Sequence, residues 1–334
     1  MTDQTKPSAH DVARLAGVSQ AAVSRAFTPG ASIAEATREK VFSAAESLGY
    51  RPNLLARSLI KGKSDIVGIV IGSSLNAFFA AALDELSQRL SKEGKHILMF
   101  TAKEGVNADA QVEDLLKYRV DALLMMAAGM SSAMAIRCTS EKVPVIFFNR
   151  QPRKSENFTT VVGNNREGAK QIAEHLLQQG YKKIALIRGR EESLTSRDRE
   201  AGFTSHLAKK NVTLHDAEIG HFHREGAIEA TRKLLNSKRR PDAIFCTNDY
   251  MAFAAIEVAR YEFGLTIGKD LGIVGFDDVE QSSWPSFELT TFTCPIGDMI
   301  ERALKILLAD EDYLAPKLTI LDGVLKPRSS TIRK

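Results

Sequence analysis

The stretch AHDVARLAGVSQAAVSRAFTP, residues 9–29, decides how the first part of the chain folds. Apolar residues from Val12 to Ala16, Leu15 among them, recur at three-to-four spacing, which predicts the buried face of a short helix. Gly17 predicts a tight turn, because glycine readily adopts backbone angles that a Cβ forbids. Ser19 predicts the start of a second helix, since its hydroxyl can accept from the free amides of the first turn.

The second helix is predicted to bury Val23 and Ala26 and to present a polar face to solvent. Two short helices with this turn form a helix-turn-helix, whose second helix enters the major groove of DNA. An ordinary helical hairpin in a core is the alternative, because short motifs of this kind also occur by chance. The residues expected to face DNA are Ser19, Gln20, Ala21, Ser24 and Arg25.

A third helix is expected over residues 36–48, ended by Gly49. Pro52 then interrupts the chain, and Asn53 can cap a short helix over residues 54–60. A helix of this length is unstable alone, because nucleation is unfavourable. We therefore expect the helix at residues 53–60, within a hinge and linker over 53–63, to be disordered off DNA and to fold when paired with its dimer mate in the minor groove.

Four segments, in this order and spacing, resemble the lactose-repressor (LacI/GalR) family of bacterial transcription regulators: VARLAGVSQAAVSRAF, TREKV, LGYRPNLLARSL and IVGIVI. The similarity runs essentially from end to end. It implies an all-α helix-turn-helix head followed by an α/β, two-lobed periplasmic-binding-protein-like (type I) effector domain. It also implies that Asn53, Ala56 and Leu59 contact DNA, with Leu59 as a wedge in the minor groove. Packing of Leu59 against the following lobe is the alternative.

The positive charge of the chain is concentrated at its start. Residues 1–63 contain nine lysines and arginines and five acidic residues, so they carry the whole net charge of +4. Neutralisation of DNA phosphates requires such a basic segment. A solvated basic face is the ordinary explanation of a charge run, but here the run coincides with the helix-turn-helix.

The composition is that of a globular protein, with 44% hydrophobic and 26% charged residues. Cys138, Cys246 and Cys294 are isolated and show neither metal-ligand nor disulfide spacing. Neither a signal peptide nor a membrane-spanning run is recognisable, so a cytoplasmic location is expected. No cofactor and no metal are expected.

From residue 65 onward, continuous apolar runs alternate with amphipathic stretches, which predicts parallel sheets covered on both faces by helices. Strands are expected at 66–71, 95–100, 121–127, 143–148, 182–187, 241–246 and 271–276. Helices are expected at 78–92, 108–118, 166–179, 199–209, 225–235, 250–263 and 296–308.

The expected domains are a DNA-binding head over residues 1–52, the hinge over 53–63, and an effector-binding and dimerisation domain over 64–334. The family resemblance divides this last domain into two lobes with three crossings between them. Lobe one is expected at about 64–161 plus 292–320, and lobe two at about 162–291 plus 321–334.

Polar and aromatic residues follow the expected strand ends, where parallel sheets bind ligands. Family position assigns Arg197, Phe222 and Asp277 to the effector cleft. The alternatives are that Asn248 and Asp278 cap helices and that Arg197 and Asp277 form a structural ion pair. Phe78 is expected in the core. The full set of effector candidates is Phe79, Asn149, Arg197, Phe222, Asn248 and Asp277.

These observations predict a sequence-specific DNA-binding regulator, most simply a repressor, controlled by a small effector such as a sugar or sugar derivative. It should bind palindromic double-stranded operator DNA as a homodimer, because two-fold dimers read palindromic half-sites. Enzyme readings lack support, since no dinucleotide, phosphate-loop, zinc-protease or nucleophile-elbow motif is recognisable. A solute-binding protein of a sugar transport system is the alternative from another class.

Overall fold

The computed structural model describes residues 7–28, 30–51, 63–72, 77–103, 107–150, 158–309 and 317–332. The chain divides into two compact units, Met1–Ser64 and Asp65–Lys334, and each is described by itself. The expected hinge at residues 53–63 falls almost entirely outside the described residues, which resume at Lys63.

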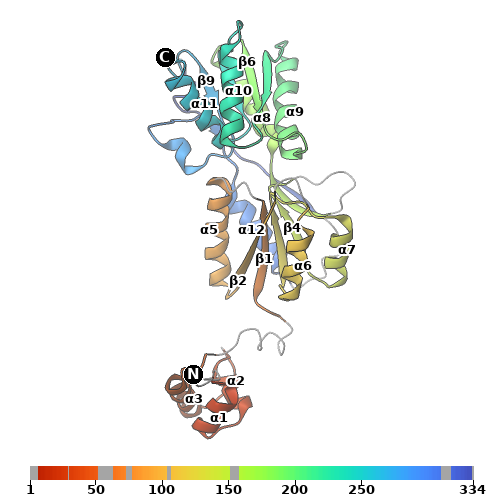
Figure 1. Cartoon of the computed structure of the whole chain (residues 1–334), viewed down its shortest axis with the longest axis vertical. Coiled ribbons are helices and arrows are strands. Elements are labelled where there is room, and N and C mark those ends of the chain that lie inside the picture. Colours follow the sequence, from red (N-terminus) through yellow and green to blue (C-terminus); the bar gives the residue numbers. More distant parts are fainter. Residues whose placement is uncertain are drawn as a thin grey trace, which may run out of the picture. The chain divides into compact units, whose positions relative to one another are not determined.

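The first unit consists of three helices, α1 (Ala9–Ala16), α2 (Gln20–Ala26) and α3 (Glu35–Leu48) (Figure 1). Gly17 ends α1 with a left-handed φ of 66°, and the Ser19 hydroxyl accepts from the amide of Ala22 at 3.2 Å at the start of α2. Val23 and Ala26 pack against the other two helices in one small core. The helix-turn-helix prediction is confirmed.

The placement of Leu15 in the buried face of α1 was wrong, because its side chain is 57% exposed. Val12 and Ala13 alone supply the fully buried part of that helix. A helix of two turns buries only a narrow stripe. Residue 13 lies about 100° from residue 12 in one direction around the helix and residue 15 lies about 60° from it in the other, so residue 15 falls at the edge of that stripe.

The second unit alternates strands and helices, as the sequence predicts. Its strands are β1 (Ile66–Gly72), β2 (His96–Ala102), β3 (Ala122–Met126), β4 (Val145–Phe148), β5 (Thr159–Gly163), β6 (Ile184–Arg188), β7 (Asp216–Ile219), β8 (Ala243–Cys246), β9 (Gly272–Val274), β10 (Thr291–Phe292), β11 (Leu318–Leu321) and β12 (Leu325–Lys326). Its helices are α5 (Ala77–Lys92), α6 (Asp109–Lys117), α7 (Ser132–Ser140), α8 (Asn165–Gln178), α9 (Leu194–Lys209), α10 (Arg224–Asn236), α11 (Asp249–Tyr261) and α12 (Ile296–Leu307), with a short 3-10 helix at Glu280–Ser283.

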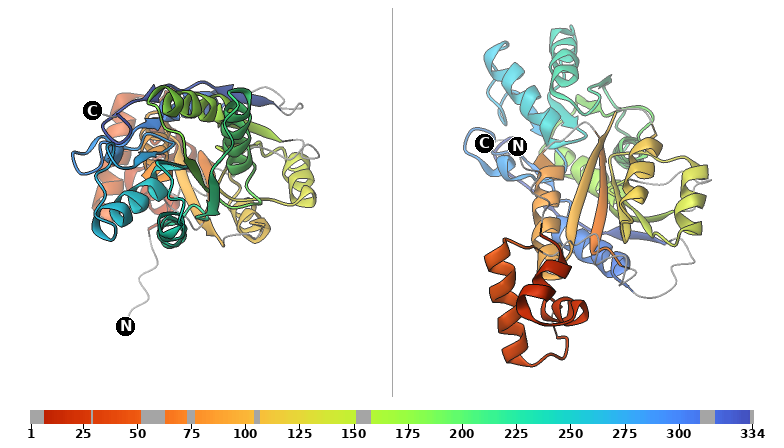
Figure 2. Two further views of the ribbon diagram at one scale, coloured as in Figure 1. Left: turned by 90° about the horizontal axis from the view of Figure 1, so that it is seen from above. Right: turned by 60° about the horizontal axis from the view of Figure 1, so that its bottom comes forward.

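The first lobe is built on a six-stranded parallel sheet in the order β11-β5-β4-β3-β1-β2. One hydrophobic cluster joins a face of this sheet to α5 and α12, and a second joins the other face to α6 and α7. Figure 2 shows the sheet between the orange helix α5 and the yellow helices. The strands are apolar on both sides because both faces are covered.

The second lobe is built on a four-stranded parallel sheet in the order β7-β6-β8-β9. Helices α8 and α9 pack on one face, and α10 and α11 pack on the other. Three segments connect the two lobes: β5 leads into α8, β10 leads toward α12, and β11 leads into β12. The fold class predicted from the sequence is confirmed.

Several short elements were not anticipated. They are the nine-residue helix α7, the strands β5 and β7 and the strands β10 to β12. The strands have only two to five residues, which is too short for a clear period. The start of α9 was also placed wrongly, because this helix begins at Leu194 rather than at residue 199. Ser193 accepts from the amide of Ser196 and caps it there.

Candidate DNA interface and effector site

The outward face of α2 carries all the DNA-facing candidates that lie in the described residues. Ser19, Gln20, Ala21, Ser24 and Arg25 are each exposed. The Nε of Arg25 donates to the carbonyl of Ala21 at 3.3 Å, which lays the guanidinium along the helix surface. Contact of these side chains with DNA remains a prediction. Asn53, Ala56 and Leu59 lie outside the described residues.

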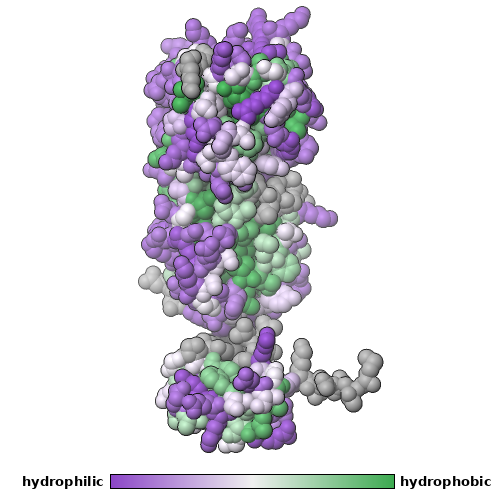
Figure 3. Space-filling view, turned by 90° about the vertical axis from the view of Figure 1, so that its left-hand side faces the viewer, coloured by the Kyte–Doolittle hydropathy of each residue, from purple (hydrophilic) through white to green (hydrophobic). Residues whose placement is uncertain are grey.

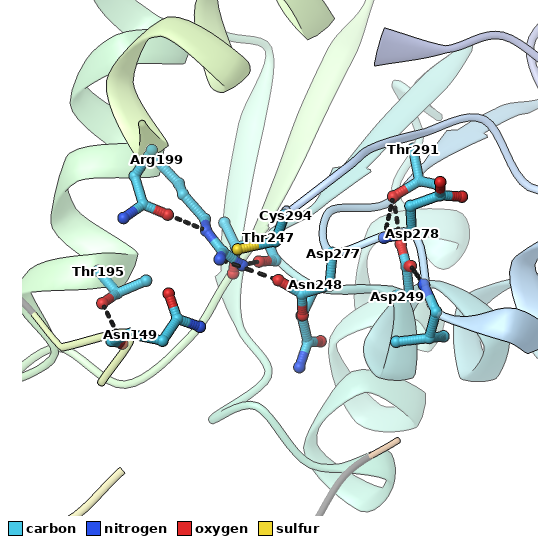
Figure 4. Close-up of polar contacts among 12 residues, drawn as sticks. Asn149, Thr195, Arg199, Thr247, Asn248, Asp249, Asp277, Asp278, Thr291 and Cys294 are labelled. Atoms are coloured by element: carbon cyan, nitrogen blue, oxygen red, sulfur yellow. Dashed lines mark hydrogen bonds and ion pairs between the residues drawn. The ribbon is translucent and has the colours of Figure 1, made fainter. Parts of the chain in front are cut away.

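Three effector candidates of the second unit, Asn149, Asn248 and Asp277, follow the carboxyl ends of strands β4, β8 and β9. Asn149 follows β4, and its carbonyl accepts from the Thr195 hydroxyl at 3.4 Å, near the start of α9 (Figure 4). This hydrogen bond joins the end of a first-lobe strand to the second lobe. Asn149 has a left-handed φ of 52°, and its buried Oδ1 has no hydrogen-bond partner within the described part of the chain.

The centre of the site is a buried ion pair between Arg199 and Asp277. Arg199 Nη2 lies 3.0 Å from Asp277 Oδ1, and the two side chains are 2% and 7% exposed. Arg199 Nε donates to Asn165 Oδ1 at 2.8 Å, and Nη1 donates to the carbonyl of Thr247. The guanidinium carbon also lies 3.7 Å from the centroid of the Phe276 ring. Every nitrogen of the Arg199 guanidinium therefore has an acceptor within the protein.

Asp277 lies in a turn with unusual backbone geometry. It has φ of 120°, and the following Asp278 has φ of 55°, both in a region that non-glycine residues rarely occupy. Such strain persists only where the surroundings hold it. Arg328 Nη2 donates to Asp278 Oδ1 at 2.8 Å, and Asp249 Oδ2 accepts from the amide of Val279 at 3.0 Å.

The electrostatics of the turn follow from its burial. Burial raises the pKa of Asp277 to about 7, although Arg199 lowers it. Burial also raises the pKa of the fully buried Asp249, which accepts from Thr291 at 2.6 Å and from Ser282 at 2.8 Å. Asp249 therefore ties the start of α11 to the turn and to a segment that crosses between lobes.

The structure shows that Arg199, and not Arg197, supplies the guanidinium that pairs with Asp277. Arg197 is exposed, and its Nε donates to the carbonyl of Glu191 at 2.7 Å. Two residues along a helix differ by about 200°, so Arg197 and Arg199 point to nearly opposite sides of α9. The ion pair with Asp277 exists, but Arg199 makes it.

Asn248 and Asp278 were both candidates for helix caps, and the structure separates them. Asn248 is 2% exposed and caps α11, because its Oδ1 accepts from the amide of Met251 at 3.0 Å. Asp278 instead pairs with Arg328 and accepts from the Thr293 hydroxyl at 2.9 Å. The capping alternative is therefore confirmed for Asn248, whose Oδ1 is the capping acceptor, and not for Asp278.

The two aromatic candidates differ in their surroundings. Phe222 has a left-handed φ of 64° in the turn before α10, and it lies so close to Gly189 that a Cβ there would meet the ring at 2.1 Å. Phe79 is 8% exposed and belongs to the core cluster under α5 and α12. Phe78 is 1% exposed in the same cluster, as expected. Phe222 is thus the more available ring.

The site contains residues that were not among the effector candidates chosen from the sequence. Asn165, Thr195 and Thr247 all contact Arg199 or Asn149, and Asp249 and Arg328 hold the turn at Asp277. A polar residue directly after a strand was the available signal for Thr247. Among the described residues, no group of three or more His, Cys, Asp or Glu side chains is arranged to hold a metal ion.

Comparison with known proteins finds family matches in two parts of the chain. Residues 8–53 match the model of bacterial regulatory proteins of the lacI family, and residues 173–331 match the periplasmic binding protein-like domain. The HTH-type transcriptional repressor PurR of Aliivibrio fischeri (strain MJ11) is 31% identical over 312 residues, which cover 91% of this chain and 92% of that protein. The probable HTH-type transcriptional repressor ExuR of Bacillus subtilis (strain 168) is 29% identical and covers 86% of each.

Solved structures extend the similarity to the whole chain. The lac repressor dimer bound to operator and the anti-inducer ONPF is similar with a TM-score of 0.86 and 26% identity, over 98% of this chain and 100% of that one. The lac repressor bound to ONPG in the repressed state is similar with a TM-score of 0.85 and 27% identity, again over 98% of this chain. With its helix-turn-helix, its two parallel sheets and these relatives, the chain belongs to the lacI family of bacterial regulatory proteins.

Proposed function

We propose that this protein is a sequence-specific transcriptional repressor that binds operator DNA as a homodimer and is controlled by a small effector. The observation that carries the proposal is the exposed face of α2. A serine-capped helix there presents Gln20, Ala21, Ser24 and Arg25 to solvent on a basic unit. This is the arrangement by which a recognition helix reads base edges.

Homodimer formation is supported by the exposed apolar surface of the second unit. Met99 on β2, Tyr250 on α11 and Trp284 are 48%, 41% and 45% exposed. Figure 3 shows hydrophobic side chains, in green, on one face of this unit. Apolar surface of this kind favours association between subunits. Sedimentation at micromolar concentration should give a dimer, and a monomer or a tetramer would contradict this part of the proposal.

The proposed effector site lies at the carboxyl ends of the strands and uses Asn149, Phe222, Asn248 and Asp277, with Phe79 beneath it and Arg199 in place of Arg197. The proposed domains are 1–52, 53–63 and 64–334, with the lobes divided as the sequence suggests. A sugar or sugar derivative suits a site with carboxylate, amide and aromatic groups. Because these groups come from both lobes, an effector that contacts both biases the angle between them.

The solute-binding alternative shares the two-lobed unit but has no use for a DNA-binding head. We further propose a cytoplasmic location and no catalytic activity. Among the described residues, no helix is both long enough and apolar enough to span a membrane. The proposed roles require access to the chromosome, which a cytoplasmic protein has.

Selection of bound fragments from a random DNA library tests the proposal directly. A repressor of this kind should enrich one palindromic sequence, with specific binding about 10³ to 10⁷ times tighter than non-specific binding. Failure to enrich any sequence, combined with thermal stabilisation by a sugar, would favour the solute-binding alternative. A thermal-shift screen of sugars, sugar phosphates and nucleobases identifies the effector, because ligand binding to the native state raises its stability.

A further inference from the structure

Asn165 occupies the point where the chain enters the second lobe from the first. It is the first residue of α8, and the preceding Asn164 is tied to another crossing segment. The amide of Asn164 donates to the carbonyl of Leu321 at 2.8 Å, and its Nδ2 donates to Asp322 Oδ1 at 2.7 Å. Two of the three crossing segments are therefore joined directly beside Asn165.

The side chain of Asn165 is used to hold Arg199. It is 2% exposed, and its Oδ1 accepts from Arg199 Nε at 2.8 Å. Its Nδ2 is buried and has no hydrogen-bond partner among the residues that the structure describes. An unpaired buried N–H group costs free energy. The favourable contact of the Asn165 amide is therefore the one made by its oxygen, which accepts from Arg199. That oxygen, with Asp277 on Nη2 and Thr247 on Nη1, prevents the guanidinium from rotating.

Close packing makes Asn165 move with the backbone around it. A Cβ on Gly202 of α9 would meet the carbonyl oxygen of Arg166 at 2.3 Å, and one on Gly168 would meet the Phe292 ring at 2.6 Å. The first turn of α8 thus lies directly on α9 and on a crossing segment. Asn165 is 2% exposed and lies in this closely packed region, where side chains have little freedom to rearrange.

We propose that Asn165 is a positioning residue that couples the crossing segments to the effector site. It holds Arg199, and through Arg199 the carboxylate of Asp277, in one position relative to the segments that join the lobes. A change in the angle between lobes then alters the geometry of Asp277. This inference rests on the proposed function, since it concerns the regulation of the same site.

Hydrogen exchange of the full ligand-free protein, followed by mass spectrometry, tests the proposal. Asn165→Leu keeps the shape of the side chain and removes the acceptor. Amide exchange in peptides covering residues 277–279 should become about tenfold faster, because a hydrogen bond to a charged group is lost. The amides of Asp277 and Asp278 donate to Phe292 and Thr291 of β10, and the amide of Val279 donates to Asp249, so their exchange reports the turn itself.

Two further variants separate positioning from general stability. Asn165→Asp retains the acceptor and should restore slow exchange. Arg166→Ala removes the neighbouring contact between α8 and α9, in which Arg166 Nε lies 2.7 Å from Asp198 Oδ1 on the surface. This control should leave residues 277–279 unchanged.

The exchange rates of these variants decide whether Asn165 positions the Asp277 turn. Equal exchange at 277–279 in Asn165→Leu and Arg166→Ala, or failure of Asn165→Asp to restore slow exchange, overturns the positioning role. If Asn165→Leu does not fold, Asn165→Ala replaces it, because alanine also removes the acceptor of Arg199 Nε and leaves the other contacts of the guanidinium in place. Failure of the proposed function is recognised separately, since it would appear as absence of sequence-specific DNA binding with this exchange pattern intact.

Discussion

The guanidinium of Arg199 lies 3.0 Å from the carboxylate of Asp277, and both side chains are almost completely buried. The pair joins the middle of α9 to a turn that follows β9. Asn165, Thr247 and the Phe276 ring surround the guanidinium. Burying a charge pair costs the desolvation free energy of both partners, which offsets much of their attraction. We therefore expect the pair to matter chiefly because it fixes the position of Asp277.

Breaking this pair should destabilise the protein strongly. Arg199→Met leaves Asp277 buried without its counter-charge, and we expect a loss of about 3–5 kcal/mol in the free energy of unfolding. The loss should be greater at pH 8 than at pH 6, because Asp277 can take up a proton at the lower pH. Urea denaturation at the two pH values measures it. The matched control is Arg197→Ala, an exposed position where a change within about 0.5 kcal/mol is expected. A larger effect in the control than in Arg199→Met would refute the corrected assignment.

The raised pKa of Asp277 predicts a specific pH dependence. The folded protein holds this carboxyl with a pKa of about 7, against the ordinary value of 3.8 for an aspartate side chain. The folded state therefore binds the proton more tightly than the unfolded state, and stability falls as pH rises between these values. Relative to Asp277→Asn, the wild type should lose stability from about pH 4 to pH 7 and change little outside that window. Urea titrations of both proteins across this range give the difference. A wild type that gains stability with pH would mean that Arg199 keeps Asp277 ionised throughout.

Arg25 should distinguish one base pair from another. We expect Arg25→Ala to cost about 1–3 kcal/mol at the contacted base pair and to relax the preference there. Arg14→Ala is the matched control, because Arg14 is exposed on α1 and pairs with Asp11 at 2.9 Å. Fluorescence titration with the selected operator and its single-base variants provides the measurement. Equal weakening for every sequence would make Arg25 a phosphate contact only.

Ser19 should have separable effects on folding and on DNA binding. Ser19→Ala removes the cap of α2 and should destabilise the first unit by about 0.5–2 kcal/mol. Ser19→Asp restores a capping acceptor, so the stability should recover. The added negative charge faces the DNA phosphates, so operator affinity should nevertheless fall. Thermal denaturation and DNA titration of the two variants test both statements. Full operator affinity in Ser19→Asp would show that residue 19 lies away from the DNA.

Much of the fold follows from local physical chemistry that the sequence displays. Gly17 and Ser19 act within a few residues of themselves, by backbone freedom and by capping, so the helix-turn-helix is readable without a structure. The long apolar runs at β1 and β3 likewise predict buried parallel strands, because only a sheet covered on both faces buries every residue of a strand. The concentration of positive charge before residue 64 is also a property of the sequence alone.

The geometry of the effector site depended on the tertiary structure. Choosing between Arg197 and Arg199 requires knowing how α9, which begins at Leu194, is oriented on the sheet. The two side chains are two residues apart and so point about 200° away from each other around the helix. The strand β11 pairs with β5 from a position more than 150 residues later in the chain, and no local pattern specifies that partner. Asn165, Asp249 and Arg328 hold Arg199 and the Asp277 turn from three distant segments. The sequence by itself determined most of the longer helices and strands, because capping and apolar periodicity act locally, whereas α7 and the shortest strands were not recognisable from it. Only the packed fold decided which side chains meet, because contacts between distant segments depend on how the whole chain buries its apolar surface.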